Sequence, residues 1–368
     1  MKFNINTQDL LDGLTNVSRA LAVRPVKQIM EGILFDALED RVVLTCTNGS
    51  LSIETTLTAE VEERGRLVLP GRILLEIIRK ISNPNLTITE QTNSVLIRSG
   101  SFRASLTAMD ADEFPETPRM TPLTTLEIPQ VQLKKMINGV VFSIAVEDSK
   151  PILTGCLLEV KPHEMCLVAL DGYRLALMRA DREFNVEETG FKAVIPGKVM
   201  NEMSRIMLDE EENCVLLFSR THMEASFANT RLTSVLLAGE YIDYRKILPT
   251  AFKTTAILNK DQFQNAIDRA SLMAREGKNN LIKMNIREES ILVTSAAEIG
   301  SISDEFPIQL TGDPMEIAFN ARYLQEVIKN LEQEEVVMHL NSNVSPCIFT
   351  SVEGEEYLYL VLPVRIFQ

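Results

Sequence analysis

The hydrophobic positions of residues 3–22 predict an amphipathic helix after a short strand. Apolar side chains stand at Leu10, Leu14, Val17 and Leu21, a spacing that places them on one face of an α-helix. The same stripe returns twice, first at Leu133, Ile137, Val140 and Ile144, and then at Phe263, Ile267, Ala270 and Ala274. The pattern therefore predicts three related segments that bury the same helix face.

A second helix repeats in the same way. "LPGRILLEIIRKI" starts at Leu69, "IPGKVMNEMSRIM" at Ile195 and "FNARYLQEVIKNL" at Phe319. Between and after the helices, apolar and polar residues alternate in runs rich in Val, Ile, Leu and Thr, which is typical of half-buried strands. Each repeat therefore reads as a strand, a helix, three strands, a helix and three strands.

This order predicts an α+β fold made of three tandem copies of a two-helix, β-sheet domain. The domains are expected at residues 1–120, 121–250 and 251–368. Residues 112–125 and 243–255 combine proline with polar residues and are interpreted as linkers. The period is far longer than that of a solenoid repeat, so each repeat is expected to have its own core.

Each second helix carries two cations and a glutamate at fixed positions. Counted from Gly71, Gly197 and Ala321, position +1 holds Arg72, Lys198 and Arg322, position +8 holds Arg79, Arg205 and Lys329, and position +5 holds Glu76, Glu202 and Glu326. Apolar residues dominate positions +2, +3, +6 and +10, although Tyr323 adds a hydroxyl at +2. At about 100° per residue, the cations point away from the predicted core.

The whole chain is acidic, with a formal net charge of -14, which argues against non-specific nucleic-acid binding by its outer surface. One basic helix face is explained by solvation and by ion pairs within the helix. Three equivalent faces in an acidic chain instead favour a common basic surface for the phosphate backbone, which carries no sequence information. Other cations near the helices could add to it, namely Arg24, Lys134, Lys135, Arg275 and Lys278.

Motifs of common enzymes are absent from the sequence. It contains no GxGxxG, P-loop, HExxH or GxSxG, and His163, His222 and His339 stand apart. The acidic clusters at 110–113, 208–212, 332–335 and 353–356 have no spacing that converges on a metal, and are interpreted as solvated loops. We therefore expect no catalytic residue, metal or cofactor. An enzyme with a site assembled across domains and a protein scaffold that never touches DNA remain alternatives.

Five cysteines without a CxxC motif predict buried thiols in a reducing compartment. The N-terminus lacks the apolar region of a signal peptide, and no stretch approaches the roughly 18–20 apolar residues of a membrane span. We therefore expect a cytoplasmic protein.

Four short motifs point to a known family: "ALDGYRLAL" (169–177), "GEYIDYRKILP" (239–249), the Arg24-Pro25 pair and the terminal "LPVR" (362–365). Together with the three repeats, they resemble the bacterial DNA polymerase III sliding clamps (beta subunits) over essentially the whole chain. The resemblance implies a non-catalytic processivity factor, a head-to-tail homodimeric ring around duplex DNA in the nucleoid, and an ATP-driven clamp loader. It implies DNA contacts from Arg24, Arg72, Arg79, Lys198, Arg205, Arg275, Lys278, Arg322 and Lys329.

The resemblance also implies a hydrophobic cleft between the second and third domains, where the replicative polymerase and other clamp-binding proteins dock a short peptide. Its walls would be Leu153, Leu170, Gly172, Tyr173, Arg174, Leu175, Ile242, Lys246, Ile247, Asn320, Tyr323, Val344, Leu360, Leu362, Pro363, Val364 and Arg365. Leu170, Tyr173 and Ile242 replace a threonine, a histidine and a proline that are familiar in the family, so we expect a bulkier, more apolar cleft. Many of these aliphatic residues are equally compatible with plain core.

The same resemblance implies a dimer interface on the edge strand "FRASLTAM". Arg103, Ala104 and Leu106 would face Leu272 and Met273 of a second copy of the chain. Ala104 stands where a phenylalanine can occur. Because a large buried side chain contributes about 1.5–3 kcal/mol, we expect a weaker dimer.

Overall fold

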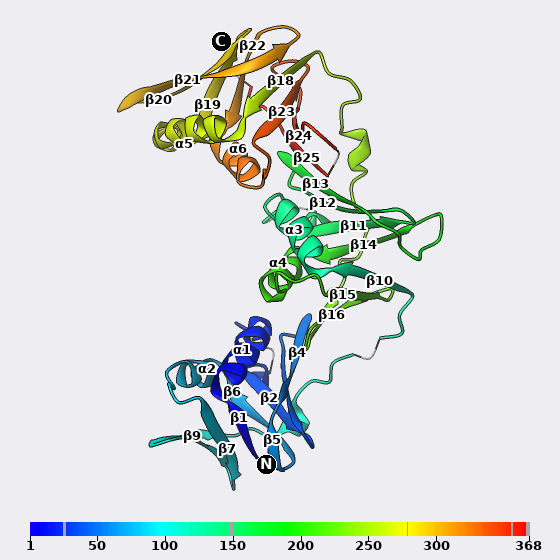
Figure 1. Ribbon diagram of the computed structural model, residues 1–368, viewed down its shortest axis with the longest axis vertical. Helices are drawn as coiled ribbons and strands as arrows, with labels where there is room; N and C mark the ends of the chain where they lie inside the picture. Colours follow the sequence, from blue (N-terminus) through cyan, green and yellow to red (C-terminus); the bar gives the residue numbers. More distant parts are fainter. Residues whose placement is uncertain (25–26, 119, 147–149, 278, 355, 366–368) are drawn as a thin grey trace. The chain divides into compact units, whose positions relative to one another are not determined.

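The computed structural model describes residues 1–24, 27–118, 120–146, 150–277, 279–354 and 356–365. Within these residues the chain forms six α-helices, two in each repeat, as the hydrophobic stripes predict (Figure 1). They are α1 (Thr7–Val17), α2 (Gly71–Arg79), α3 (Gln130–Val141), α4 (Gly197–Ile206), α5 (Lys260–Glu276) and α6 (Ala321–Ile328).

Strands make up the rest of each repeat. The first repeat contains β1 (Lys2–Asn6), β2 (Gly32–Ala37), β3 (Arg41–Thr47), β4 (Leu51–Thr58), β5 (Glu60–Glu63), β6 (Gly65–Pro70), β7 (Asn85–Gln91), β8 (Ser94–Ser99) and β9 (Phe102–Thr107). The second contains β10 (Thr124–Pro129), β11 (Gly155–Lys161), β12 (Glu164–Leu170), β13 (Arg174–Asp181), β14 (Phe191–Pro196), β15 (Asn213–Phe218), β16 (His222–Phe227) and β17 (Thr230–Val235). The third contains β18 (Thr254–Asn259), β19 (Leu281–Ile286), β20 (Ser290–Ala297), β21 (Gly300–Thr311), β22 (Met315–Asn320), β23 (Glu335–Leu340), β24 (Cys347–Ser351) and β25 (Tyr357–Val361).

The prediction of three strands between the two helices was wrong in every repeat. An additional strand, β6, β14 or β22, runs directly into the second helix, and the first repeat also contains β5. Strand and helix meet without an intervening turn, since α2 begins at the residue after Pro70 and α4 at the residue after Pro196. The apolar residues of the strand therefore merge in sequence with those of the helix.

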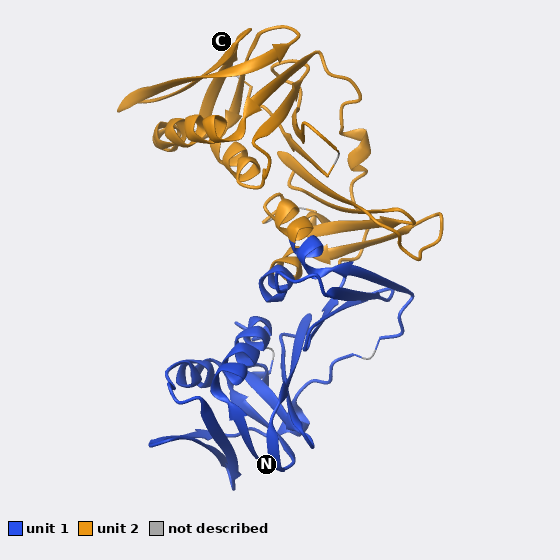
Figure 2. Cartoon of the chain, in the orientation of Figure 1, with its two compact units in different colours: residues 1–134, 202–236 blue, residues 135–201, 237–368 orange. Residues whose placement is uncertain are grey.

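The chain divides into two compact units, one of residues 1–134 with 202–236 and one of residues 135–201 with 237–368 (Figure 2). The first unit contains an eight-stranded sheet in the order β10-β15-β16-β17-β4-β3-β2-β6 and a five-stranded sheet in the order β5-β1-β7-β8-β9. In the larger sheet, β17 of the middle repeat pairs antiparallel with β4 of the first, with Leu232 opposite Ile53. One sheet thus continues from one repeat into the next.

The second unit contains a twelve-stranded sheet in the order β14-β11-β12-β13-β25-β24-β23-β18-β21-β20-β19-β22. Here β25 of the third repeat pairs antiparallel with β13 of the middle repeat, with Leu360 opposite Leu175. The last strand of a repeat therefore joins the preceding repeat in the same way in both units.

Helices bury the predicted stripes against these sheets. In the first unit α1 packs against β4 and α2, and in the second α5 packs against β20, β21 and α6. Asn6 and Asn259 cap α1 and α5, because their side chains accept backbone N–H groups that lack a partner within the helix. The fourth stripe position was predicted wrongly for Leu21 and Ile144, which lie beyond the ends of α1 and α3 and are half-buried.

All five cysteines, Cys46, Cys156, Cys166, Cys214 and Cys347, are free and buried, as predicted. Burial raises the pKa of the Cys46 and Cys347 thiols well above the usual value, and the pKa values of Cys156, Cys166 and Cys214 to about 12. These thiols therefore stay protonated at neutral pH.

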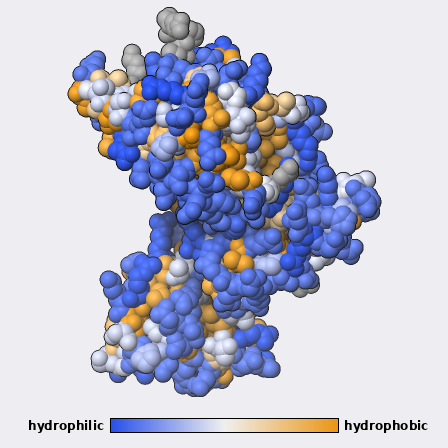
Figure 3. Space-filling view, turned by 45° about the horizontal axis from the view of Figure 1, so that its top comes forward, coloured by the Kyte–Doolittle hydropathy of each residue, from blue (hydrophilic) through white to orange (hydrophobic). Residues whose placement is uncertain are grey.

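Hydrophilic residues cover most of the face seen in Figure 3, with hydrophobic residues in separate patches. None of the helices in the described residues has the length and apolar character needed to cross a bilayer.

Candidate functional site

The six repeated cations of the second helices are all exposed. Arg72, Lys198 and Arg322 at position +1 and Arg79, Arg205 and Lys329 at position +8 face solvent. The predicted core side is less regular, because Ile73 at position +2 is 50% exposed and Tyr323 is half-buried. Position +7 is buried instead, with Ile78, Ser204 and Ile328 facing inward. The basic face predicted from the sequence thus forms on each of the three helices.

The glutamate at position +5 binds a cation in each repeat. Glu76 accepts a hydrogen bond from Arg79 at 2.7 Å. Glu202 lies 3.6 Å from Arg205 and also accepts a bond of 3.0 Å from Arg19 of the first repeat.

Glu326 likewise accepts a bond of 3.0 Å from Arg322, and it pairs with Arg174 of the middle repeat. These carboxylates offset part of the positive charge of each helix, and two of them also bind an arginine of the preceding repeat.

The additional cations near the helices differ in their surroundings. Arg24 and Arg275 are exposed, whereas Lys278 lies outside the described residues. Lys134 forms an ion pair of 2.8 Å with Asp209. Lys135 pairs with Glu332 at 2.8 Å and Glu356 at 3.4 Å, and the hydrogen bond to Glu332 raises the pKa of Lys135.

The turn between β12 and β13 orients two predicted peptide-contacting residues. Gly172 has a φ of 89°, a conformation that favours glycine. Asp171 accepts backbone hydrogen bonds from Tyr173 at 2.9 Å and Arg174 at 3.1 Å. Tyr173 remains 60% exposed, whereas Arg174 is only 7% exposed.

Arg174 contacts several protein groups. Its Nε donates to Asp171 at 3.0 Å, its Nη2 donates to the carbonyl of Phe142 at 2.5 Å, and its guanidinium lies 4.7 Å from the centre of the Tyr323 ring. Burial lowers the pKa of Arg174, and the charge of Asp171 opposes that shift. The residue therefore connects the turn, the residue after α3, and α6 more than it offers a free cation to a ligand.

The apolar residues of the predicted cleft divide into a buried floor and an exposed rim. Leu153, Leu170, Leu175 and Leu360 belong to one buried cluster, against which Ile242 and Leu362 pack. The rings of Tyr173 and Tyr323 stack with centroids 5.9 Å apart. Ile247 is 40% exposed and Val344 57% exposed. The structure thus brings the floor residues and Ile242 together, while Ile247 and Val344 present apolar surface to solvent.

The polar and terminal residues of the predicted cleft have other local roles. The Asn320 side chain caps α6 by accepting the N–H of Arg322 at 3.0 Å, and Lys246 pairs with Asp243 at 3.1 Å. In the terminal motif, Leu362 donates its N–H to the carbonyl of Tyr173 at 2.8 Å. Val364 donates its N–H to the carbonyl of Ala318 at 2.8 Å, Pro363 is half-buried and Arg365 is exposed.

Glu159, which the sequence did not single out, anchors the segment that follows the middle repeat. It is 5% exposed, and Tyr244 donates its hydroxyl to it at 2.7 Å. Arg245 donates from both terminal nitrogens, at 3.2 and 2.6 Å, and Lys192 lies 2.6 Å away. Residues 243–255 were predicted as a polar linker, but Tyr244 is only 3% exposed. The only sign of this role in the sequence was the presence of a glutamate within the apolar strand β11.

Burial alone raises the pKa of Glu159, but the hydrogen bonds from Arg245, Lys192 and Tyr244 outweigh it and lower the pKa to about 2. An unfolded glutamate has a pKa of about 4.3, so the charged form stabilises the fold above that pH. The stabilisation is lost as the pH falls through the window from about 4.5 to about 2.

We expect E159Q to lower the free energy of unfolding by about 3 kcal/mol at pH 7, because one pKa unit corresponds to about 1.4 kcal/mol. The difference between wild type and E159Q should shrink towards zero near pH 2. Urea unfolding of both proteins across this pH range measures the difference in free energy of unfolding. The contributions of titratable groups that both proteins share cancel in that difference. A difference that does not change with pH would contradict the assignment.

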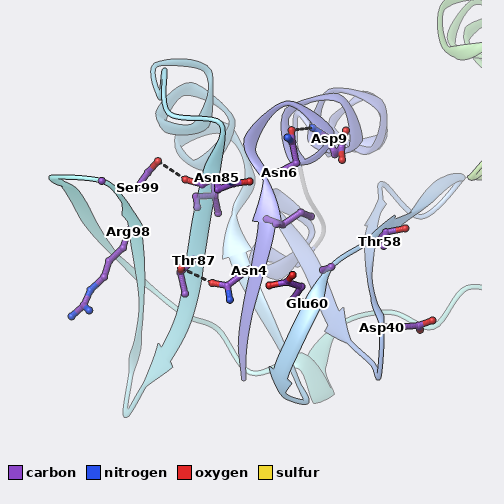
Figure 4. Close-up of a pocket in the computed structure, with 14 residues that line it drawn as sticks. Asn4, Asn6, Asp9, Asp40, Thr58, Glu60, Asn85, Thr87, Arg98 and Ser99 are labelled. Atoms are coloured by element: carbon purple, nitrogen blue, oxygen red, sulfur yellow. Dashed lines mark hydrogen bonds between the residues drawn. The ribbon is translucent and has the colours of Figure 1, made fainter.

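A polar pocket of about 680 Å³ lies in the first repeat, away from all predicted site residues. Its side chains largely bind one another or the backbone, since Thr87 donates to Asn4 at 2.6 Å and Ser99 to the carbonyl of Asn85 at 2.8 Å. Figure 4 shows that Asp40, Glu60 and Arg98 do not point to a common centre. We therefore assign no ligand to this pocket.

No group of three or more His, Cys, Asp or Glu residues within the described ranges is placed to hold a metal ion. The histidines have separate neighbours: His163 lies 2.8 Å from Glu183, His222 2.9 Å from Thr221, and His339 stacks on Phe252.

The predicted dimer-interface residues lie on β9, where Arg103 is exposed and Ala104 and Leu106 are half-buried, and on α5. Strand β9, with Arg103, Ala104 and Leu106, is the last strand of the five-stranded sheet. Leu272 on α5 is 61% exposed, and Met273 is half-buried.

Comparison with known proteins shows the family. Residues 1–118, 127–243 and 245–365 match the N-terminal, central and C-terminal domains of the DNA polymerase III beta subunit. The Beta sliding clamp of Bacillus subtilis is 32% identical to this chain, and the match covers 100% of both sequences.

Solved structures agree with this match. The crystal structure of the Bacillus subtilis sliding clamp aligns with a TM-score of 0.94 at 32% identity. A putative DNA polymerase III beta subunit from Eubacterium rectale aligns with a TM-score of 0.94 at 29% identity, and both alignments cover 100% of each chain.

The three two-helix repeats and the full-length matches define a DNA polymerase processivity factor rather than a catalyst. The chain belongs to the family of beta sliding clamps, the beta subunits of DNA polymerase III. This confirms the resemblance and the three-domain α+β fold predicted from the sequence.

Proposed function

We propose that two copies of this chain join head to tail into a closed ring that encloses duplex DNA in the cytoplasm, at the nucleoid. The three domains of each copy would span residues 1–120, 121–250 and 251–368. The helices would line the hole, and an ATP-driven clamp loader would open the ring and place it on DNA. The ring would tether the replicative polymerase and other clamp-binding proteins to the duplex.

The observation that carries this proposal is the equivalent exposure of the cations at positions +1 and +8 of all three second helices. Such a face attracts phosphates of any sequence, and the glutamate at position +5 limits the strength of the attraction. Weak, non-specific contacts suit a ring that slides along DNA.

Exposed apolar side chains on the first and third repeats support the head-to-tail dimer. At α4 and α6, the glutamate at position +5 binds an arginine of the preceding repeat, Arg19 or Arg174. In the first repeat, Glu76 instead pairs with Arg79 of its own helix, and Ile73 on that helix is 50% exposed. Leu272 of the third repeat is 61% exposed. A second copy of the chain would cover both surfaces.

The proposed peptide site comprises the buried floor, the stacked Tyr173 and Tyr323, and the exposed rim residues Ile247 and Val344. Apolar anchors surrounded by a few polar groups are typical of sites that bind short linear segments. The replicative polymerase, the clamp loader and other clamp-binding proteins would occupy it in turn.

Topology provides the test of the ring. The protein, loaded on nicked circular DNA by the clamp loader of its own organism, is expected to stay bound through gel filtration at high salt. It is then expected to leave within minutes when a restriction enzyme linearises the circle. Retention that is the same on circular and linear DNA would overturn the ring model.

The same assay separates the alternatives. A scaffold that never touches DNA would show no retention on either form. An enzyme that binds DNA through an ordinary site would dissociate equally from circles and linear fragments as the salt concentration rises.

A further inference from the structure

Glu159 lies on the strand face that forms the floor of the proposed peptide site. Successive side chains of a strand point to opposite faces, so Glu159 shares a face of β11 with Leu157. Leu157 belongs to the buried cluster that contains Leu153, Leu170 and Leu175. The carboxylate is thus fixed to the same rigid sheet as the floor of the site.

The segment that Glu159 holds contributes two residues to the proposed site. We call residues 241–248 the docking segment. Tyr244 and Arg245, which bind Glu159, stand between Ile242, which packs on the floor, and Ile247, which is exposed at the rim. A short 3₁₀ turn, Tyr244–Lys246, joins them, and Ile247 donates its N–H to the carbonyl of Tyr244 at 3.0 Å.

Both oxygens of Glu159 are occupied by the docking segment and by β14. Oε1 accepts from Arg245 and lies beside Lys192, while Oε2 accepts from Tyr244 and from the second terminal nitrogen of Arg245. The Arg245 guanidinium also lies 4.6 Å from the centre of the Tyr244 ring. A bidentate arginine–carboxylate pair of this kind fixes the orientation of the two groups as well as their distance.

Apart from the pairs with Glu159, the docking segment forms few hydrogen bonds with the sheet among the described residues. Tyr241 donates its hydroxyl to the carbonyl of Gly155 at 3.4 Å, a long bond. The Tyr241 hydroxyl also has a hydrogen bond with the backbone of Leu170, and Tyr241, Ile242, Tyr244 and Leu248 pack on the apolar cluster. Tyr241 holds the start of the segment, whereas Glu159 forms the charged hydrogen bonds at Tyr244 and Arg245, between Ile242 and Ile247.

We propose that Glu159 is a positioning residue for peptide binding: it holds the docking segment on the sheet so that Ile242 and Ile247 form a preorganised wall of the site. The inference deepens the proposed function and rests on the peptide site named there. Without the carboxylate, the wall forms in only a fraction of the molecules, and the apparent dissociation constant rises by the inverse of that fraction.

The test uses full-length protein and a short fluorescein-labelled synthetic peptide with two leucines and a phenylalanine. E159Q keeps the shape of the side chain but turns an amide NH₂ towards the cationic donors. We expect about tenfold weaker peptide binding, as for a wall formed in about one molecule in ten. Faster amide hydrogen exchange is expected in residues 241–248, but not in β18 and β23.

E164Q is the matched control. Glu164 lies on the same hairpin, and its ion pairs within the described residues are with Lys161 and Arg179, at 3.9 and 3.7 Å, rather than with the docking segment. Its peptide affinity and exchange should equal those of wild type. Y244F removes one hydrogen-bond donor to Glu159 and keeps the pair with Arg245. Its peptide affinity should lie between those of wild type and E159Q, and it replaces E159Q in the test if E159Q does not fold.

The outcomes separate the two proposals. If wild type does not bind the peptide, the proposed peptide site fails, whatever the exchange data show. If wild type binds and E159Q or Y244F binds equally well, the positioning role is overturned. Weaker binding without faster exchange in the docking segment also overturns it, because the effect then acts by another route.

Discussion

The triple variant R79E, R205E and K329E is expected to bind DNA at least tenfold more weakly than wild type at moderate salt. Each exposed cation that contacts a phosphate contributes about 0.9 to the slope of log affinity against log salt concentration. Reversing one cation per repeat should therefore reduce that slope as well as the affinity. Fluorescence anisotropy with a duplex at several salt concentrations measures both, and loading onto primed circles should decline in parallel.

A second triple variant of equal charge provides the control. R41E, K161E and R287E reverse one exposed cation of each repeat at the ends of strands rather than on the second helices. If the helix faces are the DNA contacts, this variant should bind DNA far better than the first. Equal losses in both variants would mean that net charge, and not the basic helix faces, governs binding.

The variant Y323A is expected to lose peptide binding by about 30-fold or more, since truncating an aromatic residue at the centre of a site typically costs at least about 2 kcal/mol. Tyr323 stacks on Tyr173 and supports the guanidinium of Arg174, so its removal opens the floor of the site at two points. Less Y323A should be loaded onto circles, because the clamp loader docks on the same proposed site, but the rings that are loaded should stay on circular DNA as long as wild-type rings do. Peptide anisotropy measures the affinity of the site, and the lifetime on circles after loading measures ring closure.

Y323F is the informative companion, because it keeps the ring and its stacking and removes only the hydroxyl. Peptide affinity close to that of wild type is expected. A loss as large as that of Y323A would assign the effect to a hydrogen bond from the hydroxyl instead of the ring.

Periodic features were predictable from the sequence because they depend on local geometry. The stripe that begins at Leu10 defines the buried face of α1, and the spacing of Lys198 and Arg205 places both on the solvent side of α4. The repetition of each pattern at a constant interval gave the three domains. Strand β14 was missed because its apolar residues run into α4 without a turn.

Ion pairs between residues far apart in the sequence were not predictable, because the local sequence pattern does not indicate which residues meet. Arg174 was expected to line the peptide site, and its ion pairs with Asp171 of its own repeat and Glu326 of the next were not foreseen. Glu159 finds its partners about 85 residues along the chain, at Tyr244 and Arg245. A buried glutamate in an apolar strand indicates that a cation is close, without naming it.

The burial of all five cysteines gives experiments on this protein a practical starting point. Maleimide dyes and crosslinkers react with the thiolate form of accessible thiols, and each native thiol here is both covered and held protonated. A single cysteine placed on β9, and another in place of Leu272, should therefore be modified selectively in the otherwise native chain. With a mild oxidant such as oxidised glutathione, the two cysteines would form a disulfide across the proposed contact between two copies, and a reductant would cleave it.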